Sequence, residues 1–274
     1  MGLSDLKRPL LMIGCGTMAG AILVRWLAAG LDPAVVSVVD PGRLSPPAPG
    51  VTLLPALPDA LPEETIVLLG VKPQSLPEVA PKIAPLLNGG HLVISMLAGV
   101  TLANLSTALG EVAQIVRIMP NTPVALGKGV CAYYADPEGD GDAVAVVMRL
   151  LSPLGLLERI ADETQFNLVT ALTGCGPAFV FRFIDALAQG ASALGLERNQ
   201  ALRLALATVE GASALAAQAG EHPAILADKV ASKGGMTREG LDVLDEGGRF
   251  NSLIAAMMYA ARDRGEELER LSAG

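Results

Sequence analysis

Aromatic and histidine residues are scarce in this chain of 274 residues. Aromatics make up 3% of the residues, whereas apolar residues together make up 51%, so the core has to be built from Ala, Val, Leu, Ile and Met. The two histidines, His91 and His222, have no acidic or cysteine residue at ligand spacing. This pattern disfavours histidine-based acid–base catalysis and predicts no metal site.

Basic charge and paired cysteines are lacking as well. The formal net charge is −8, so the surface cannot neutralise the phosphates of a nucleic acid, and we expect no nucleic-acid partner. The three cysteines, Cys15, Cys131 and Cys175, are scattered with neither a pairing pattern nor metal-ligand spacing. Three free thiols are typical of a protein in a reducing compartment.

Long unbroken hydrophobic runs are also absent. The apolar stretch near the start of the chain is interrupted by Gly14, Gly16 and Gly20, which is not typical of an export signal. The uncharged stretch 91–110 is long enough to span a bilayer, but several Ser, Thr and Asn residues interrupt it. We therefore expect a soluble, cytoplasmic protein without a membrane partner.

Two domains are predicted from the length and from the order of secondary-structure signals. In the first part, short apolar strands such as 8–15, 34–40 and 65–71 alternate with helical stretches, which indicates a parallel sheet covered by helices on both faces. The proline-rich stretch 45–64 is interpreted as a surface connection. From about residue 161 strand signals vanish. The expected fold is α/β: a Rossmann-type parallel-sheet domain over 1–160, followed by an all-α dimerisation domain over 161–274.

Several of the helices expected in the second domain are apolar around most of their circumference. A domain of this size cannot bury so much apolar surface by itself. We therefore expect a homo-oligomer whose helices pack across the interface.

The stretch "IGCGTMAGA" contains the motif G-x-G-x-x-A at Gly14, Gly16 and Ala19, between the first predicted strand and the first predicted helix. In this context Gly14 permits a tight turn, Gly16 lets the backbone approach a pyrophosphate, and Ala19 keeps helix and strand close. The helix N-terminus then faces the anion. The motif predicts a dinucleotide site, and the alternative is a glycine turn without a ligand.

An acidic residue, Asp40, ends the second predicted strand, where it would accept hydrogen bonds from the adenine ribose and repel a 2′-phosphate. This slightly favours NADH, although Arg43 could instead bind the 2′-phosphate of NADPH. Lys72 ends another strand at the same sheet edge and is either a cofactor contact or an ordinary solvated lysine.

Six segments together resemble the pyrroline-5-carboxylate reductase family over nearly the whole chain. They are, in order, "IGCGTMAGAIL", "GVKPQ", "LAGVTLANL", "RIMPNTP", "LTGCGPAFVFRFIDALAQGASALGL" and "HPAILADKVASKGGMTREGLDVLDEGG". The resemblance implies an NAD(P)H-dependent oxidoreductase that transfers hydride to C5 of 1-pyrroline-5-carboxylate and so completes proline biosynthesis. It also implies a homodimer, possibly a decamer of five dimers, with an active site between the two domains.

The resemblance further implies which residues bind the ligands. Successive N–H groups of the loop before a late helix would hold the substrate carboxylate, and the hydroxyl of Thr237 would bind the ring nitrogen and orient the imine. The alternative for Thr237 is a plain N-cap. The implied substrate-binding residues are Ser232, Gly234, Gly235, Met236 and Thr237. The implied cofactor-binding residues are Gly14, Cys15, Gly16, Thr17, Met18, Ala19, Asp40, Arg43, Val71, Lys72, Pro73, Met96, Leu97, Ala98 and Asn121.

Two departures from the family pattern keep other functions open. Lys233 stands where the family usually has a proline, and Lys229 stands where some members have an asparagine that contacts the cofactor. One alternative is a related imine or hydroxyacid reductase that uses a lysine as proton donor. The other is a dinucleotide-binding redox sensor without catalysis.

Overall fold

The computed structural model describes residues 2–110, 114–136 and 141–272, which form two compact units. The first unit comprises Met1–Cys175 together with Ala261–Gly274, and the second comprises Gly176–Ala260. The first unit extends past the predicted boundary at 160/161. The reason is that Phe166 packs with Met119 and Ile160 against the sheet.

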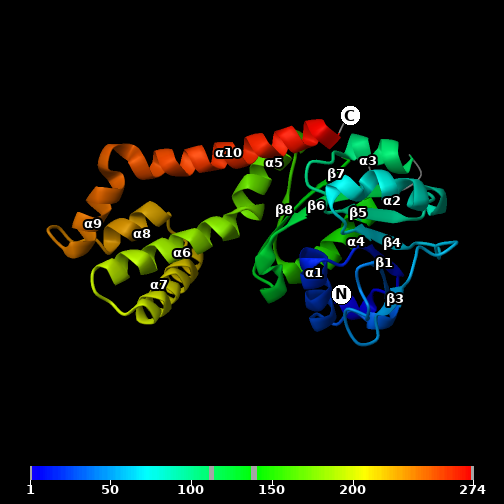
Figure 1. The fold of residues 1–274 in the computed structure, drawn as a ribbon, viewed down its shortest axis with the longest axis horizontal. Helices are drawn as coiled ribbons and strands as arrows, with labels where there is room; N and C mark the ends of the chain where they lie inside the picture. The colour runs from blue at the N-terminus through cyan, green and yellow to red at the C-terminus, as the bar shows by residue number, and fades with distance from the viewer. Residues whose placement is uncertain (1, 111–113, 137–140, 273–274) are drawn as a thin grey trace. The chain divides into compact units, whose positions relative to one another are not determined.

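The first unit is built on one eight-stranded sheet with the strand order β3-β2-β1-β4-β5-β6-β7-β8 (Figure 1). All neighbouring strands are parallel except β6 and β7, which are antiparallel. The predicted α/β sheet fold is therefore confirmed, with one reversed strand pair. The strands are β1 Leu10–Ile13, β2 Val36–Val39, β3 Thr52–Leu54, β4 Ile66–Leu69, β5 Leu92–Ser95, β6 Gln114–Pro120, β7 Gly129–Ala135 and β8 Gly155–Arg159.

Helices cover both faces of this sheet, because successive side chains of each strand point to opposite faces. Leu10 and Met12 of β1 pack on one side with α1 and α4, and Leu11 and Ile13 pack on the other with α2 and α3. The helices are α1 Thr17–Ala28, α2 Leu76–Ile83, α3 Leu102–Leu109, α4 Gly141–Leu151 and the short α5 Phe166–Val169.

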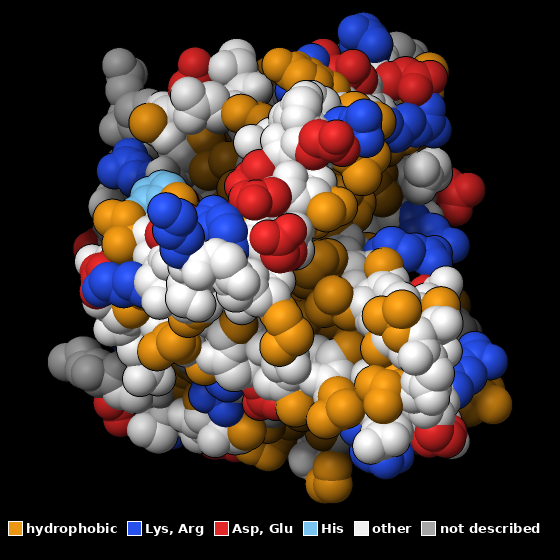
Figure 2. All heavy atoms as spheres, turned by 90° about the vertical axis from the view of Figure 1, so that its left-hand side faces the viewer, with side chains coloured by type: hydrophobic (Ala, Val, Ile, Leu, Met, Phe, Trp, Pro, Cys, Tyr) orange, Lys and Arg blue, Asp and Glu red, His pale blue; other side chains and the backbone are white. Residues whose placement is uncertain are grey.

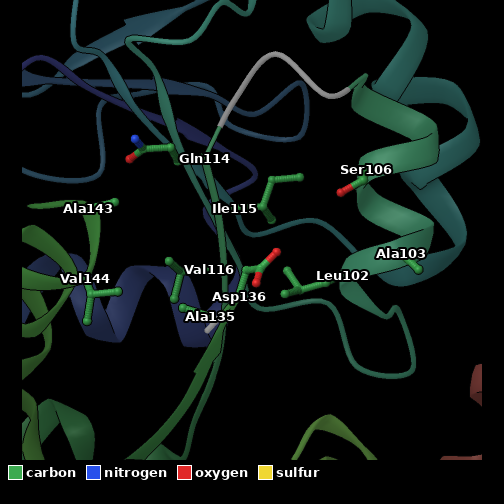
Figure 3. Close-up of a pocket in the computed structure, with 10 residues that line it drawn as sticks. All are labelled: Leu102, Ala103, Ser106, Gln114, Ile115, Val116, Ala135, Asp136, Ala143 and Val144. Carbon is green, nitrogen blue, oxygen red and sulfur yellow. The ribbon is translucent and has the colours of Figure 1, made fainter. Parts of the chain in front are cut away.

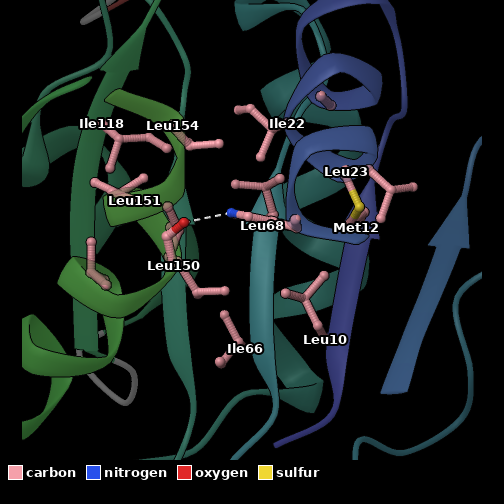
Figure 4. Packing of buried hydrophobic residues seen from close by; sticks show 14 of the residues in the cluster. Leu10, Met12, Ile22, Leu23, Ile66, Leu68, Ile118, Leu150, Leu151 and Leu154 are labelled. Carbon is pink, nitrogen blue, oxygen red and sulfur yellow. Dashed lines mark hydrogen bonds between the residues drawn. The ribbon is translucent and has the colours of Figure 1, made fainter. Parts of the chain in front are cut away.

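Figure 4 shows part of the first of these cores, with Ile22 and Leu23 of α1 packed beside Leu10 and Met12 of β1. The same core contains the single tryptophan of the chain. Trp26 is fully buried, and its indole Nε1 donates a hydrogen bond of 2.6 Å to the carbonyl oxygen of Leu150. Leu150 lies in the last turn of α4, where carbonyl groups lack a partner within the helix. The bond therefore fixes α4 to α1 over the sheet.

Short helical turns link these elements. Most are 3₁₀ turns, and the segment before α6 is a π-helical turn. The 3₁₀ turns are η1 Leu3–Asp5, η2 Pro33–Val35, η3 Pro73–Ser75, η4 Ala84–Leu86, η5 Thr122–Leu126, η6 Ser152–Leu154, η7 Glu163–Gln165 and η9 Glu246–Gly248, and the π turn is η8 Thr170–Gly174.

The second unit is entirely helical over Gly176–Ala260, apart from its connecting loops. Its helices are α6 Gly176–Ala193, α7 Arg198–Ala219, α8 Pro223–Lys229, α9 Met236–Asp245 and the first part of α10 Arg249–Ser272. Helices α6 and α7 pack together through Ala188, Ala201 and Ala205.

Large apolar side chains remain exposed on this unit. Phe181 is 63% exposed, Leu204 51% and Leu253 67%. Figure 2, in which the second unit faces the viewer, shows hydrophobic side chains gathered in groups between the charged ones. Contiguous apolar surface of this kind is typical of a subunit interface.

One helical stretch among the described residues, Glu163–Ala193, is long and apolar enough to cross a membrane by length and composition alone. Sequence reasoning had considered the stretch 91–110 instead, and the structure divides that stretch between β5 and α3. A helix that packs against another subunit can have the same length and apolar composition, so this finding by itself does not indicate a membrane-spanning helix.

Candidate functional site

The turn between β1 and α1 passes very close to the end of β4. Gly14 has a φ of +84°, and a Cβ at this position would lie 2.9 Å from the carbonyl carbon and oxygen of Gly70 and from the side chain of Val71. Its own N–H donates a 2.8 Å hydrogen bond to the carbonyl of Val39. The turn has room only for glycine here, as the motif predicts.

Gly16 has the opposite surroundings, because a Cβ there would have no other described heavy atom within 4 Å apart from the glycine itself, its chain neighbours and the backbone of its own helix. Gly16 is the N-cap of α1, and the structure shows no side-chain hydrogen bond that caps this helix. Both Gly16 and Thr17 are exposed. Open space in front of uncapped N–H groups fits the pyrophosphate of a dinucleotide.

Asp40 and Arg43, which follow β2 in the chain, form hydrogen bonds with the backbone of the glycine turn. The two carboxylate oxygens of Asp40 accept hydrogen bonds from the N–H of Cys15 at 2.9 Å and of Gly42 at 3.0 Å. Arg43 donates from Nε and Nη2 to the carbonyl oxygen of Cys15 at 3.3 and 3.0 Å. The sequence predicts a ribose contact for Asp40 and a possible 2′-phosphate contact for Arg43, with a plain turn at Asp40–Gly42 as the alternative. It does not predict that both side chains also bind the backbone of the glycine turn.

The thiol of Cys15 lies inside this arrangement and is 1% exposed. Burial raises its pKa; the nearby Arg43 guanidinium opposes this effect, and the Asp40 carboxylate adds to it. The thiol therefore stays protonated near neutral pH. Cys15 therefore takes part in the turn through its backbone, whose N–H binds Asp40 and whose carbonyl oxygen binds Arg43.

A cavity of about 700 Å³ opens beside the turn. Gly14, Asp40 and Val71 line one part of it, and the segment Pro55–Asp59 with Val79 of α2 lines the rest. A largely apolar cavity that is also lined by Asp40, Asp59 and Lys82 suits a flat base joined to a ribose. The cavity wall from Pro55 to Asp59 was missed, because the proline-rich stretch 45–64 had been interpreted as a surface connection; it also contains strand β3.

A second, smaller cavity of about 380 Å³ lies at the start of α1. Cys15, Gly16 and Thr17 line it together with Gly20 and Arg43. The Arg43 side chain is 34% exposed, so its guanidinium remains accessible from this cavity. Asp40 thus lines the larger cavity, and Arg43 lines the smaller one.

The other predicted cofactor residues follow further parallel strands at the same carboxyl edge of the sheet, where ligands of such folds bind. Val71, Lys72 and Pro73 follow β4, and the Lys72 side chain is exposed. Met96, Leu97 and Ala98 follow β5, and Leu97 donates its N–H to the Ser95 hydroxyl at 3.3 Å. Met18 is half-buried and Ala19 fully buried in α1. The structure therefore brings these residues to one edge of the first unit.

Asn121 lies at this edge too, after β6, but its side chain already has protein partners. Its Nδ2 donates to the carbonyl of Thr173 at 2.9 Å, and its Oδ1 accepts from the N–H of Val130 at 2.8 Å. The residue is 7% exposed. These bonds fasten the π turn η8 to the sheet, so contact with a cofactor stays a prediction for Asn121.

The predicted substrate loop lies in the second unit, directly before α9. Gly234 has a φ of +72°, and the N–H of Gly235 donates to the carbonyl of Ser232 at 2.9 Å. Gly235 is the N-cap and has no side-chain cap, Met236 begins the helix and the exposed Thr237 follows it. The alternative that Thr237 is the N-cap is therefore wrong, and its hydroxyl remains accessible beside the first helical N–H groups.

The charged side chains around this loop are mostly paired. Lys229 Nζ donates to both carboxylate oxygens of Glu221, at 2.7 and 2.6 Å. Arg238 donates to Asp228 at 2.7 Å, and this bond raises the pKa of the arginine further. Lys233 is exposed. The pairing of Lys229 with Glu221 argues against the alternative in which this lysine donates a proton to a substrate.

A third cavity, of about 400 Å³, lies between α3 and β6 (Figure 3). Residues such as Leu102 and Ser106 of α3, Gln114 of β6 and Val144 of α4 line it. Gln114 begins β6 and Leu102 begins α3, and among the described residues that line this cavity there is none of the predicted cofactor-binding residues. Within 2–110, 114–136 and 141–272, no three potential metal-ligating side chains lie together.

Comparison with known families gives two matches to this chain. Residues 163–268 match the family described as pyrroline-5-carboxylate reductase dimerisation. Residues 10–99 match the family described as NADP oxidoreductase, coenzyme F420-dependent. The first match begins two residues after the predicted start of the helical domain, and the second contains the glycine turn.

Individual relatives are similar over nearly the full length. Pyrroline-5-carboxylate reductase from Synechocystis sp. is 38% identical, and the alignment covers 94% of this chain and 97% of that protein. The enzyme of the same name from Escherichia coli is 34% identical with the same coverage. The structure of a pyrroline-5-carboxylate reductase from Coxiella burnetii has a TM-score of 0.84 at 30% identity, covering 96% of this chain and 99% of that one. A Plasmodium falciparum pyrroline carboxylate reductase with NADP bound has a TM-score of 0.83 at 24% identity, covering 96% and 98%, which shows the common fold.

Proposed function

The chain belongs to the pyrroline-5-carboxylate reductase family, and we propose that two loops carry its reaction, the reduction of 1-pyrroline-5-carboxylate to L-proline by NAD(P)H. The glycine turn Gly14–Ala19 binds the dinucleotide, and the loop Ser232–Thr237 binds the substrate. The observation that carries the first assignment is the open space in front of the uncapped N-terminus of α1. The loop before α9 offers the same kind of uncapped N-terminus in the second unit.

The dinucleotide supplies a hydride from C4 of its nicotinamide ring when it is bound. Gly16 and Thr17 present backbone N–H groups to the pyrophosphate, because the helix dipole favours negative charge at this end. Asp40 keeps the turn in shape through the N–H of Cys15 and accepts from the ribose with its remaining lone pairs. The chain's part in this half of the reaction is to hold the dinucleotide in one orientation.

The substrate carboxylate is bound by N–H groups at the start of α9. The N–H of Gly235 is already bonded to the carbonyl of Ser232, so the N–H groups offered to an anion are those of Met236 and Thr237, and no side chain caps this end of the helix. The positive φ of Gly234 turns the backbone into this helix start. The helix has ten residues, so its N-terminus attracts a carboxylate. This fixes the ring of the substrate by one end.

Thr237 then orients the substrate ring through its nitrogen. Its hydroxyl donates a hydrogen bond to the ring nitrogen and helps deliver the proton that this nitrogen gains when C5 accepts hydride. A proton shared with the ring nitrogen makes the C=N bond more electrophilic as hydride reaches C5, so the reaction needs good positioning more than a strong acid. This role fits a chain with two histidines and an exposed threonine at this place.

Substitution of Thr237 tests this assignment. Thr237→Ala removes the hydroxyl, and we expect kcat to fall by about 10² or more, which is the usual contribution of such a group. Thr237→Ser keeps a hydroxyl and serves as the matched control, with a loss well below that of the alanine variant. Far-ultraviolet circular dichroism verifies that both variants fold. Full turnover by folded Thr237→Ala protein would reject the role.

For the cofactor we propose a preference for NADH over NADPH. Support comes from the Asp40 carboxylate, which lines the larger cavity at the end of β2 and would repel a 2′-phosphate. Arg43 favours NADPH, because its positive guanidinium could bind the 2′-phosphate. This guanidinium lies 4.0 Å from the Asp40 carboxylate and lines the smaller cavity. The ratio of kcat/KM for the two cofactors tests the preference. Asp40→Asn should shift this ratio towards NADPH, and Arg43→Gln should shift it towards NADH.

The protein forms a homodimer through its helical unit, in accordance with the dimerisation family that matches residues 163–268. We further propose that five dimers assemble into a decamer and that the enzyme works in the cytoplasm. The three free cysteines support a reducing compartment. Light scattering coupled to gel filtration would measure ten subunits for the decamer, and a mass of two subunits would reject it.

A further inference from the structure

An arginine is buried in the middle of the first unit. Arg117 lies in β6 and is 2% exposed, and its guanidinium stacks 4.0 Å above the centre of the Phe166 ring. Its Nη1 donates to the carboxylate of Glu163, while in the described part of the chain Nε and Nη2 have no hydrogen-bond partner. Burial of an arginine is costly even when it is paired, so its presence suggests a task besides stability.

The partner of this arginine reaches a second element. The same oxygen of Glu163 that accepts from Arg117 also accepts the N–H of Leu102 at 2.8 Å. Leu102 is the first residue of α3, and the preceding Thr101 is the N-cap, whose hydroxyl accepts from the N–H of Asn104 at 3.1 Å. The carboxylate therefore fixes the point where the loop from β5 enters α3.

This loop, residues 96–101, contains three of the proposed dinucleotide-binding residues. Its first part is fixed by the bond from Leu97 N–H to the Ser95 hydroxyl. Ala98 packs against the apolar cluster that includes Met119 and Phe166, and Phe166 is the ring under the Arg117 guanidinium. Arg117 therefore supports the loop in two ways. Its guanidinium packs on Phe166, which belongs to the cluster that Ala98 contacts, and it binds the carboxylate of Glu163.

The outer side of the loop is closely packed too. Gly99 has a φ of +71°, and a Cβ there would lie 3.1 Å from the backbone of Leu268 and Glu269 in the last turns of α10. The carboxylate of Glu269 accepts a hydrogen bond from the Asn167 side chain. The loop therefore has little freedom as long as its junction with α3 is held.

We propose that Glu163, held in place by the buried Arg117, is a positioning residue that presets the loop 96–101 for the dinucleotide. The proposal rests on the proposed cofactor site, since it assigns the loop to that site. A carboxylate bound to the first N–H of α3 fixes the direction of the loop backbone before any ligand binds. The free energy of dinucleotide binding is then not reduced by the entropy cost of ordering this loop. Arg117 holds the carboxylate in place, pointed at this N–H.

Two substitutions of Glu163 test the proposal, and Glu158→Gln on the exposed side of β8 is the matched control. Glu163→Gln keeps an acceptor for Leu102 but loses the charge that holds Arg117, and Glu163→Ala loses both. We expect the dissociation constant for reduced dinucleotide, measured by fluorescence titration without substrate, to rise about tenfold in the glutamine variant and more in the alanine variant. The control should match the wild type.

Hydrogen exchange in the ligand-free protein gives a readout independent of binding. The amide of Leu102 should exchange faster in both Glu163 variants, together with amides of the loop 96–101, while β1 and β4 keep their protection. Lower thermal stability with unchanged dinucleotide affinity, or unchanged exchange at Leu102, would overturn the proposal and leave a structural ion pair. Failure of the wild type to bind dinucleotide would instead reject the proposed cofactor site. If Glu163→Ala does not fold, the glutamine variant decides alone.

Discussion

Gly14 and Gly16 lie two residues apart and differ in what an added methyl group would contact. At Gly14 the methyl would lie 2.9 Å from the Gly70 backbone with φ at +84°, whereas at Gly16 it would enter the open space in front of α1. Gly14→Ala should therefore lower the free energy of unfolding by about 2 kcal/mol or more. Gly16→Ala should leave stability within about 0.5 kcal/mol of wild type.

Dinucleotide binding should separate the same two variants. Gly16→Ala fills the place of the pyrophosphate, so its dissociation constant should rise at least about tenfold although the protein folds normally. Urea unfolding and fluorescence titration of both variants measure the two quantities. Equal effects of the two substitutions on stability would contradict the geometry of the turn.

Single residues with a fixed sequence pattern could be predicted, and residues that act through distant partners could not. Gly14, Gly16 and Asp40 follow from the strand–turn–helix pattern because each role is local. The pairing of Arg117 with Glu163 joins positions 46 residues apart, and no spacing rule connects them. The hydrogen bonds of the Asn121 side chain to Thr173 and Val130 could not be predicted either, because no sequence motif connects these positions.

At the scale of the elements, α7 begins at a glutamate that acts as its N-cap. The two carboxylate oxygens of Glu197 accept from the N–H groups of Asn199 and Gln200, each at 2.8 Å, and these bonds lower the pKa of Glu197. A lowered pKa in the folded state means that this group adds stability above the ordinary glutamate pKa. That stability is lost as the pH falls through the lowered value.

Glu197→Gln should therefore lower the melting temperature near pH 7, and the difference from wild type should shrink as the pH falls below the ordinary glutamate pKa and the wild-type carboxyl takes up its proton. Glu210→Gln, an exposed position on the same helix, controls for loss of one negative charge. Differential scanning calorimetry at several pH values measures the effect. A difference that stays constant with pH would show that the charge of the cap is unimportant.

Most elements were predictable because their apolar periods are clear, and the exceptions have physical reasons. Strand β3 was missed because it has three residues within a proline-rich stretch and lies at the sheet edge. The reversal of β7 relative to β6 was also missed. The short turn η5 joins these strands, so β7 runs back antiparallel to β6. A parallel neighbour would have required a longer crossover connection, usually a helix.

At the scale of the whole molecule, the exposed apolar side chains of the helical unit and the dimerisation match at 163–268 indicate the same interface. Sequence reasoning could predict that this domain associates, because its helices are apolar on more than one face. It could not identify which side chains remain exposed, since that depends on how α6 and α7 pack on each other.

Phe181→Glu tests this interface. Phe181 is 63% exposed on α6, and an unpaired charge buried at the interface should raise the dimer dissociation constant at least about 100-fold, equivalent to about 3 kcal/mol. Leu44→Glu is the control, since Leu44 is fully exposed in the first unit and outside the dimerisation match. Analytical ultracentrifugation over a range of concentrations measures both variants. An unchanged dimer in Phe181→Glu would place the interface elsewhere on the helical unit.

The central claim is that this chain reduces a cyclic imine with hydride from NAD(P)H, and it is tested most directly by following the absorbance of the reduced nicotinamide ring. Purified protein is supplied with 1-pyrroline-5-carboxylate and either NADH or NADPH, and L-proline is assayed as the product. We predict loss of absorbance matched mole for mole by proline, faster with NADH than with NADPH. Absence of turnover with both cofactors, from a protein that binds them, would contradict the account.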